Sequence, residues 1–166
     1  MKKLWIACVL ATSFLITGPL VQASELNNKA ALDGIQEIKV IYDVRKANPN
    51  LLLAYLKGIE SNRKNLALEG VKSTQRIVFI ADSVKYITSE PSDDVSIQHG
   101  DVLKKIAEQV KRLKSLGVEM EACSAATAAF KVDNDTILPG IQVVRSGFLS
   151  VMGWQAKGYQ LVPVYN

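Results

Sequence analysis

The chain has 166 residues, of which 48% are hydrophobic and 22% charged, a size that fits one domain with its own core. Its 20 Lys and Arg residues exceed its 16 Asp and Glu residues by only four, and the two signs are interspersed. This balance excludes the strongly basic surface typical of proteins that bind nucleic acid or anionic membranes, so we expect neither as a partner.

The first 23 residues have the pattern of a cleaved signal peptide. A start with two lysines precedes an apolar run over residues 4–16, and residues 21–23 (Val-Gln-Ala) supply small side chains before a cut ahead of Ser24. The apolar run is shorter than the ~20 residues that span a bilayer. We therefore predict a periplasmic protein whose single mature domain is residues 24–166. Loss of two lysines and no acids would lower its net charge from +4 to +2.

The cysteine count changes with this processing. Cys8 would leave with the signal peptide, and Cys123 would remain alone. A lone cysteine in an oxidising compartment cannot form a disulfide within its own chain. Cys123 is therefore predicted either to be a small buried core residue or to react with other molecules.

Strand and helix patterns alternate along the mature sequence. Residues 24–34 are polar and predicted to be frayed. Apolar and β-branched runs predict five strands, at residues 37–44, at 75–81, up to Cys123, at 141–145 and at 159–164.

Helical patterns fill the intervals between these strands. The first predicted helix begins at Asn48-Pro49 and ends at Gly70, and the second has Asp101 as its N-cap and ends at Gly117. The third follows Cys123, and the fourth runs from Ser146-Gly147 to Lys157. Residues 83–100 are ambiguous, because Pro91 and Asp93-Asp94 favour a loop in their middle.

This alternation predicts an α/β fold with a mostly parallel five-stranded sheet, because parallel neighbours need crossover connections. The strand order cannot be read from the sequence. In an open parallel sheet, ligands bind beyond the carboxyl ends of the strands. The polar and reactive residues at these predicted ends are Arg45, Lys46, Asp82, Ser83, Lys85, Cys123, Ser124, Arg145 and Ser146.

Cys123 is the predicted catalytic residue of this edge. A thiol at the start of a helix faces free N–H groups and the positive end of the helix dipole, which favours thiolate. Residues Ser124, Arg145, Ser146, Lys46 and Asp82 are predicted to bind an anionic ligand beside it. Glu119 and Glu121 oppose the thiolate, because strand alternation puts them on the same face as Cys123.

The sequence resembles the DsrE/DsrF-like sulfur-relay family, particularly its exported branch. The resemblance rests on residues 117–147 (GVEMEACSAATAAFKVDNDTILPGIQVVRSG), on IKVIYDV followed by Asn48-Pro49, and on the terminal KGYQLVPVY. It implies a three-layer, flavodoxin-like α/β/α fold, homo-oligomers, and a cysteine, here Cys123, that carries sulfur as a persulfide. Many relatives have His-Gly where Asp82-Ser83 stands, and glycine in place of Ser124.

Three functions remain open at this stage. The first is a sulfur carrier that accepts sulfane sulfur from small sulfur anions or a donor protein and passes it to an acceptor protein. The second is a non-covalent ligand-binding or oligomeric assembly module with an inert cysteine. The third is a redox-sensing thiol, which usually has a resolving cysteine that this chain lacks.

The other residues that could take part in chemistry do not indicate a second functional site. His99, the single histidine, is a candidate base but is more simply a solvated loop residue, and Met152 and Trp154 fit core or oligomer contacts. The sequence has no metal-ligand spacing, no phosphate-binding glycine loop and no Ser/His/Asp set, so it predicts no cofactor and no metal site.

Overall fold

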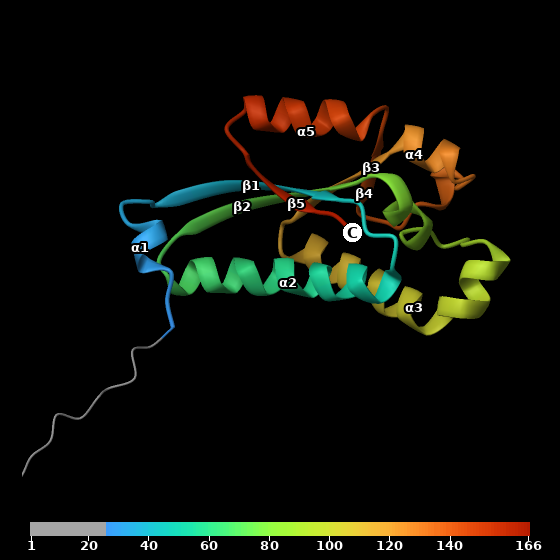
Figure 1. The fold of residues 1–166 in the computed structure, drawn as a ribbon, viewed down its shortest axis with the longest axis horizontal. Coiled ribbons are helices and arrows are strands. Elements are labelled where there is room, and N and C mark those ends of the chain that lie inside the picture. The colour runs from blue at the N-terminus through green and yellow to red at the C-terminus, as the bar shows by residue number, and fades with distance from the viewer. Residues whose placement is uncertain (1–25) are drawn as a thin grey trace, which may run out of the picture.

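The computed structural model describes residues 26–166, in which five strands form one sheet (Figure 1). The predicted signal peptide lies outside the described residues. The strand order is β4-β3-β2-β1-β5, and every neighbouring pair is parallel. The predicted α/β fold is therefore confirmed. The strands are β1 (Glu37–Val44), β2 (Lys72–Phe79), β3 (Glu119–Cys123), β4 (Ile141–Val144) and β5 (Gln160–Val164).

The register aligns the carboxyl ends of the strands along one edge. Val44, the last residue of β1, pairs with Phe79 of β2 and with Val164 of β5. Cys123, the last residue of β3, pairs with Val144 of β4. The predicted strand ends therefore do share one edge, where ligands bind in open α/β sheets.

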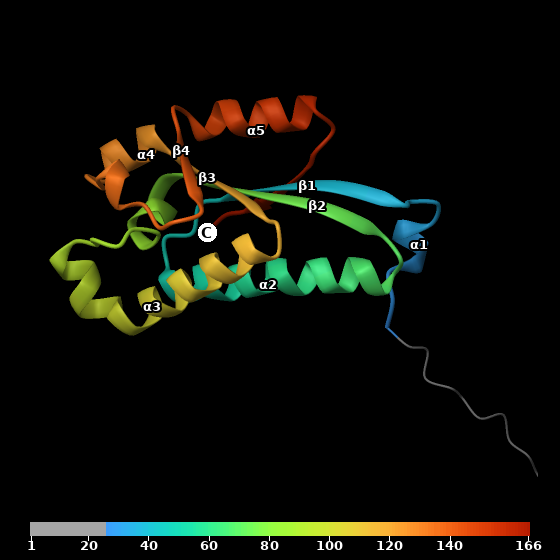
Figure 2. The ribbon, with the colours of Figure 1, turned by 180° about the vertical axis from the view of Figure 1, so that it is seen from behind.

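Helices cover both faces of the sheet. Figures 1 and 2 show α2 (Pro49–Leu68) and α3 (Asp93–Ser115) on one face, and α5 (Gly147–Ala156) with the short α4 (Ser124–Ala129) towards the other. This is the expected three-layer arrangement. Shorter helical segments are α1 (Lys29–Leu32), η1 (Ala81–Tyr86) and η2 (Asn134–Thr136). None of the helices in residues 26–166 has the length and apolar character to cross a membrane.

Local sequence signals account for most helix ends. The Asn48 side chain accepts hydrogen bonds from the N–H groups of Asn50 and Leu51, as expected of an N-cap before Pro49. At the other end of the domain, Gly158 has a φ of +86°, which suits the end of α5. Strand β2 ends at Phe79 and does not reach the predicted end at residue 81, because η1 begins at Ala81.

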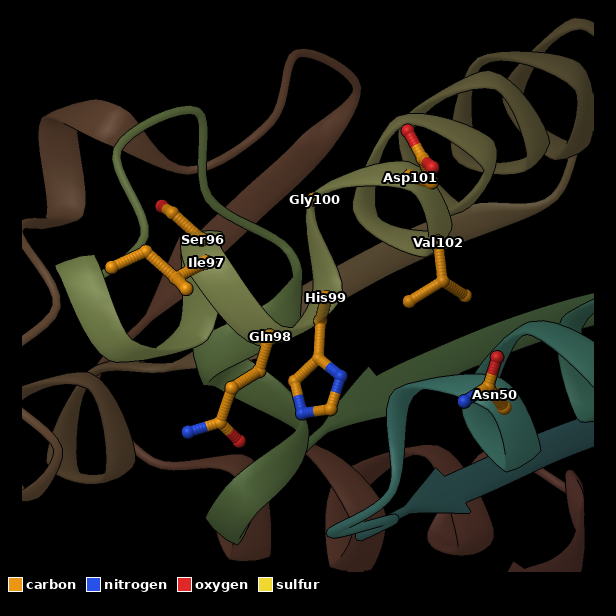
Figure 3. Close-up of a pocket in the computed structure, with 8 residues that line it drawn as sticks. All are labelled: Asn50, Ser96, Ile97, Gln98, His99, Gly100, Asp101 and Val102. Carbon is orange, nitrogen blue, oxygen red and sulfur yellow. The ribbon is translucent and has the colours of Figure 1, made fainter.

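The start of α3 differs from the prediction. The helix begins at Asp93, so Asp101 lies inside it and is not its N-cap, and His99 lies on a helix instead of a loop. The pair Asp93-Asp94 suggested a loop, but acidic side chains in the first helical turn interact favourably with the helix dipole. Figure 3 shows α3 bending near Gly100, which separates this first part from the rest of the helix.

A charged network joins α2 to α3. The buried carboxylate of Glu60 accepts hydrogen bonds from the Gln109 amide at 2.9 Å and from Arg112 at 3.0 Å. It also forms an ion pair with Lys64 at 3.0 Å, one helical turn along α2. These hydrogen bonds, above all that from Gln109, lower the pKa of Glu60 to about 2.

Within residues 26–166, one buried side chain has no hydrogen-bond partner for any of its polar atoms. Gln75 on β2 is almost fully buried, and neither its amide nitrogen nor its oxygen has a hydrogen-bond partner. Its neighbour Arg76 contacts Trp154 of α5, so alternation turns Gln75 towards the α2 and α3 layer. Desolvation of an unpartnered amide opposes folding.

Gln75→Met is expected to raise the free energy of unfolding by about 1 kcal/mol or more, because it removes two unpartnered polar atoms at nearly constant volume. Urea unfolding followed by circular dichroism measures the change. Thr74→Met, at the exposed neighbouring position, is the control and is expected to have little effect. A loss of stability on Gln75→Met would show that the amide is satisfied in solution, for example by a buried water.

Candidate functional site around Cys123

Cys123 lies where β3 gives way to α4. It is the last residue of β3 and the residue immediately before the first turn of α4, with extended backbone angles (φ −76°, ψ 115°). Its side chain makes no capping hydrogen bond. It is the free cysteine of the described residues and is only 2% exposed. The predicted position is therefore observed, but the thiol is covered.

The first turn of α5 covers Cys123. A Cβ atom placed on Gly147 would lie 3.0 Å from the Cβ of Cys123 and 2.6 Å from Cγ1 of Ile80. Glycine allows the α5 backbone to approach these two side chains this closely, and Ile80 itself is buried. The α5 layer therefore closes directly over the residue that the sequence marks as reactive.

Three of the predicted ligand residues do gather next to Cys123. The Ser124 hydroxyl donates a hydrogen bond to the carbonyl oxygen of Arg145 at 3.2 Å, which joins the start of α4 to the end of β4. Ser146 follows as the N-cap of α5 and accepts from the N–H of Leu149 at 3.5 Å. The Arg145 side chain is exposed, so it offers a cation at the rim.

Lys46 is not brought to this group. Its ammonium group donates a hydrogen bond to the carbonyl oxygen of Tyr165 and lies 4.6 Å from the centre of the Tyr55 ring, which belongs to α2. Cys123 instead packs against α5, on the other face of the sheet. Lys46 is also nearly completely buried, so its charge serves the contact between β1, α2 and the chain end.

Asp82 lies beyond the end of β2, within η1, where the strand-end rule places it. Its carboxylate forms an ion pair with Lys85 at 2.7 Å. The Lys85 ammonium also lies 5.0 Å from the centre of the Phe130 ring, which follows α4. Asp82 therefore fixes a lysine against the end of α4.

Glu121 shares the face of Cys123, as alternation requires, but its charge is engaged by side chains that the sequence did not reveal. Its Oε1 accepts a hydrogen bond from Trp154 Nε1 at 2.9 Å and lies 3.8 Å from Arg76. The Arg76 guanidinium stacks 3.5 Å from the centre of the Trp154 ring. Glu119 is more exposed and pairs with Lys114 at 3.0 Å. Each of the two acids is thus paired with a cation.

A shallow hollow of about 330 Å³ runs along α5 beside this cluster. Its lining includes Glu121, Arg145, Ser146, Trp154 and Lys157. The other oxygen of Glu121, Oε2, is buried without a hydrogen-bond partner. Two of the predicted ligand residues therefore lie in one surface depression next to the cysteine.

A second cluster, which the sequence did not mark as a unit, lies at the end of β1. The buried carboxylate of Asp43 accepts hydrogen bonds from Arg45 Nε at 2.9 Å and Nη2 at 2.6 Å, and from the Tyr165 hydroxyl at 2.8 Å. The Arg45 guanidinium lies 4.9 Å from the centre of the Phe148 ring and 4.8 Å from that of Tyr165. The hydrogen bond to Asp43 raises the pKa values of both Arg45 and Tyr165.

His99 belongs to a different region. Figure 3 shows the His99 ring extending from α3 towards Asn50 of α2. Both residues line a hollow of about 450 Å³. The ring packs edge-on against Tyr86, with centroids 6.4 Å apart. Because α2 and α3 form the layer opposite α5, His99 is not positioned as a base for Cys123. Residues 26–166 contain no group of His, Cys, Asp and Glu that could hold a metal ion.

Comparison with known proteins agrees with this architecture. MTH1491 from Methanobacterium thermoautotrophicum, a protein of unknown function, is 18% identical, with a TM-score of 0.60 over 76% of this chain and 98% of that chain. BT1422 from Bacteroides thetaiotaomicron, also of unknown function, is 19% identical, with a TM-score of 0.51 over 76% and 94%. These likenesses show the fold.

A search of curated proteins gives no match. The model of the DsrE/DsrF-like family, in contrast, matches residues 52–164. That range contains β2, β3, β4 and β5, Cys123 and the Ser124–Arg145 contact, so it includes most of the sheet and the region around the thiol. The chain therefore belongs to the DsrE/DsrF-like family.

Proposed function

We propose that this protein is a periplasmic sulfur carrier that holds sulfane sulfur as a persulfide on Cys123. Membership of the DsrE/DsrF-like family supports sulfur relay at the level of the family. The observation that carries the proposal for this chain is the position of Cys123, at the carboxyl edge of a parallel sheet and directly before α4. Export rests on the signal-peptide pattern of residues 1–23.

The transfer needs no external oxidant or reductant. The Cys123 thiolate attacks the outer sulfur of a donor persulfide, an S–S bond forms at Cys123, and the donor's S–S bond breaks to release the donor thiolate. An acceptor thiolate then attacks the same outer sulfur and restores the Cys123 thiolate. Because Cys123 is the free cysteine of the described residues, both steps take place between molecules.

The surroundings of Cys123 suit anionic sulfur compounds. Arg145 is exposed at the rim, and Ser124 and Ser146 contribute hydroxyl groups next to it. A cation at the rim attracts anionic donors and acceptors. Lys46 and Asp82, whose charges are engaged elsewhere, are not part of this proposed site.

A non-covalent assembly module remains the second candidate, because a specific observation favours it. Cys123 is nearly completely buried, whereas the apolar residues Phe148, Leu149 and Met152 of α5 are more than half exposed. An exposed apolar helix face marks a protein contact, so we include a homo-oligomer in the proposal. Sulfur uptake by Cys123 distinguishes the two candidates.

Incubation of the native protein with polysulfide is expected to add sulfur to Cys123. Intact-mass spectrometry should show the mass of one added sulfur atom, removed by dithiothreitol. The experiment uses a Cys8→Ser parent, so that only Cys123 can react, and Cys123→Ser as the control. Addition of a low-molecular-weight thiol should then transfer the sulfur and return the protein to its original mass.

Absence of uptake by the native parent, with uptake after unfolding in urea, would contradict the carrier. The thiol would then be a structural core residue, and the assembly module would replace the carrier as the proposed function. N-terminal sequencing of the exported protein tests the signal peptide separately, with Ser24 as the expected first residue.

A further inference from the structure

The first turn of α5, which covers Cys123, has one buried residue, Gly147. Gly147 has no side chain, and the next two residues of α5, Phe148 and Leu149, are 55% and 59% exposed. The capping bond from the Leu149 N–H to Ser146 is long, at 3.5 Å. Residues 147–149, here called the lid, therefore depend on other contacts to stay closed over the thiol.

Arg45 supplies such a contact from the end of β1. Its guanidinium contacts two rings: its central carbon lies 4.9 Å from the centre of the Phe148 ring in the lid and 4.8 Å from that of Tyr165. The buried Asp43 carboxylate holds Arg45 with two short hydrogen bonds and also accepts one from the Tyr165 hydroxyl. Asp43, Arg45 and Tyr165, here called the clamp, thus form one unit that the lid touches through Phe148.

The far half of α5 is anchored independently. Trp154 donates a hydrogen bond to Glu121 and stacks on Arg76, and Val151 is buried. The lid can therefore lift at the start of α5 while the rest of the helix stays on the sheet. Local openings of this kind occur where a segment has few buried contacts.

We propose that the lid and the clamp control access to Cys123: the thiol is covered while Phe148 rests on Arg45, and it becomes reactive when the lid opens. The role of lid opening in sulfur transfer rests on the proposed function, but the opening of the lid itself does not. Opening need not disturb the sheet, because the clamp residues remain bound to one another when Phe148 leaves.

The rate at which a thiol reagent labels Cys123 in the native protein tests this proposal. In the Cys8→Ser parent, dithionitrobenzoate labelling is expected to be slow. Phe148→Leu, which removes the aromatic face from Arg45, and Tyr165→Phe, which removes the hydrogen bond to Asp43, are each expected to increase the rate roughly five- to tenfold. Met152→Leu, at an equally exposed position of α5 outside the lid, and Tyr55→Phe, at 45% as exposed as Tyr165, are the matched controls.

Urea dependence separates lid opening from unfolding of the whole domain. Lid opening exposes little surface, so the labelling rate should rise only weakly with urea, far less than global unfolding requires. Labelling that follows the full urea dependence of unfolding would overturn the proposal, as would rates in Phe148→Leu and Tyr165→Phe no higher than in their controls. Labelling needs no sulfur donor, so the two proposals can fail separately. Slow labelling of the parent with faster labelling of Phe148→Leu and Tyr165→Phe, but without sulfur uptake, would contradict the carrier and support the lid.

Discussion

Gly147→Ala is expected to lower the free energy of unfolding by about 1–2 kcal/mol, whereas Gly153→Ala in the same helix is expected to raise it by up to about 1 kcal/mol. A Cβ at position 147 would lie 2.6 and 2.8 Å from Ile80 and 3.0 Å from the Cβ of Cys123. A Cβ at position 153 would meet nothing within 4 Å. Alanine favours the helix at both positions, so the difference in sign isolates the close contact.

Urea unfolding of both variants, together with Gly147→Ala/Ile80→Val, measures this contact. The Ile80→Val change removes one methyl group from the crowded side chain. The double variant should therefore lose less free energy of unfolding than the sum of the losses of the two single variants. Equal effects of Gly147→Ala and Gly153→Ala would contradict the close packing of the lid on Cys123. The lid proposal would then lose the observation that the start of α5 packs tightly on Cys123.

Local sequence patterns predicted the sheet because each strand carries its own signal. The β-branched run at residues 37–44 and the buried run before Cys123 became β1 and β3 with their expected ends. The pattern failed at Asp93 and Asp94, where the same acidic residues suit both a loop and the first turn of a helix. A helix of 23 residues therefore began eight residues before the predicted N-cap at Asp101.

The candidate site was predicted from one rule, that ligands bind beyond the carboxyl ends of parallel strands, and only what this rule covers was predictable. That rule correctly brought Ser124 and Arg145 together beside Cys123. It could not separate Arg45 from Lys46, because adjacent residues on a strand face opposite layers and the sequence does not say which layer holds the cysteine. In the structure Arg45 reaches α5 and Lys46 reaches α2.

The burial of Cys123 depends on tertiary packing, which no local pattern contains. Ser146-Gly147 was predicted to open a helix, and it does. Nothing in those two residues indicates that the helix packs back onto β3 and places Gly147 against the Cβ of Cys123. The contacts that hold α5 in place, such as Trp154 with Glu121, join residues 33 positions apart.

Glu60→Gln is expected to remove about 1–2 kcal/mol of stability at pH 6 and almost none near pH 2. Folding lowers the pKa of Glu60 from 4.5 to about 2, so the unfolded chain binds more protons between these values. The contribution of the carboxylate is complete above the unfolded pKa and is lost as the pH falls through the folded pKa. Lys64 and Arg112 are more than half exposed, so solvent screens part of the full effect of this shift.

Urea unfolding of the parent and Glu60→Gln at several pH values between 2 and 6 tests this expectation, because the two stability curves should converge as Glu60 becomes protonated in both states. Asp101→Asn is the control: its ion pair with Lys104, at 3.9 Å, joins two exposed side chains and should contribute less than about 0.5 kcal/mol at any pH. Glutamine keeps an oxygen that can accept from Gln109, so the pH-dependent difference reports the charge. A gap between the curves that stays constant from pH 6 to pH 2 would show that Glu60 joins α2 to α3 by shape and neutral hydrogen bonds alone.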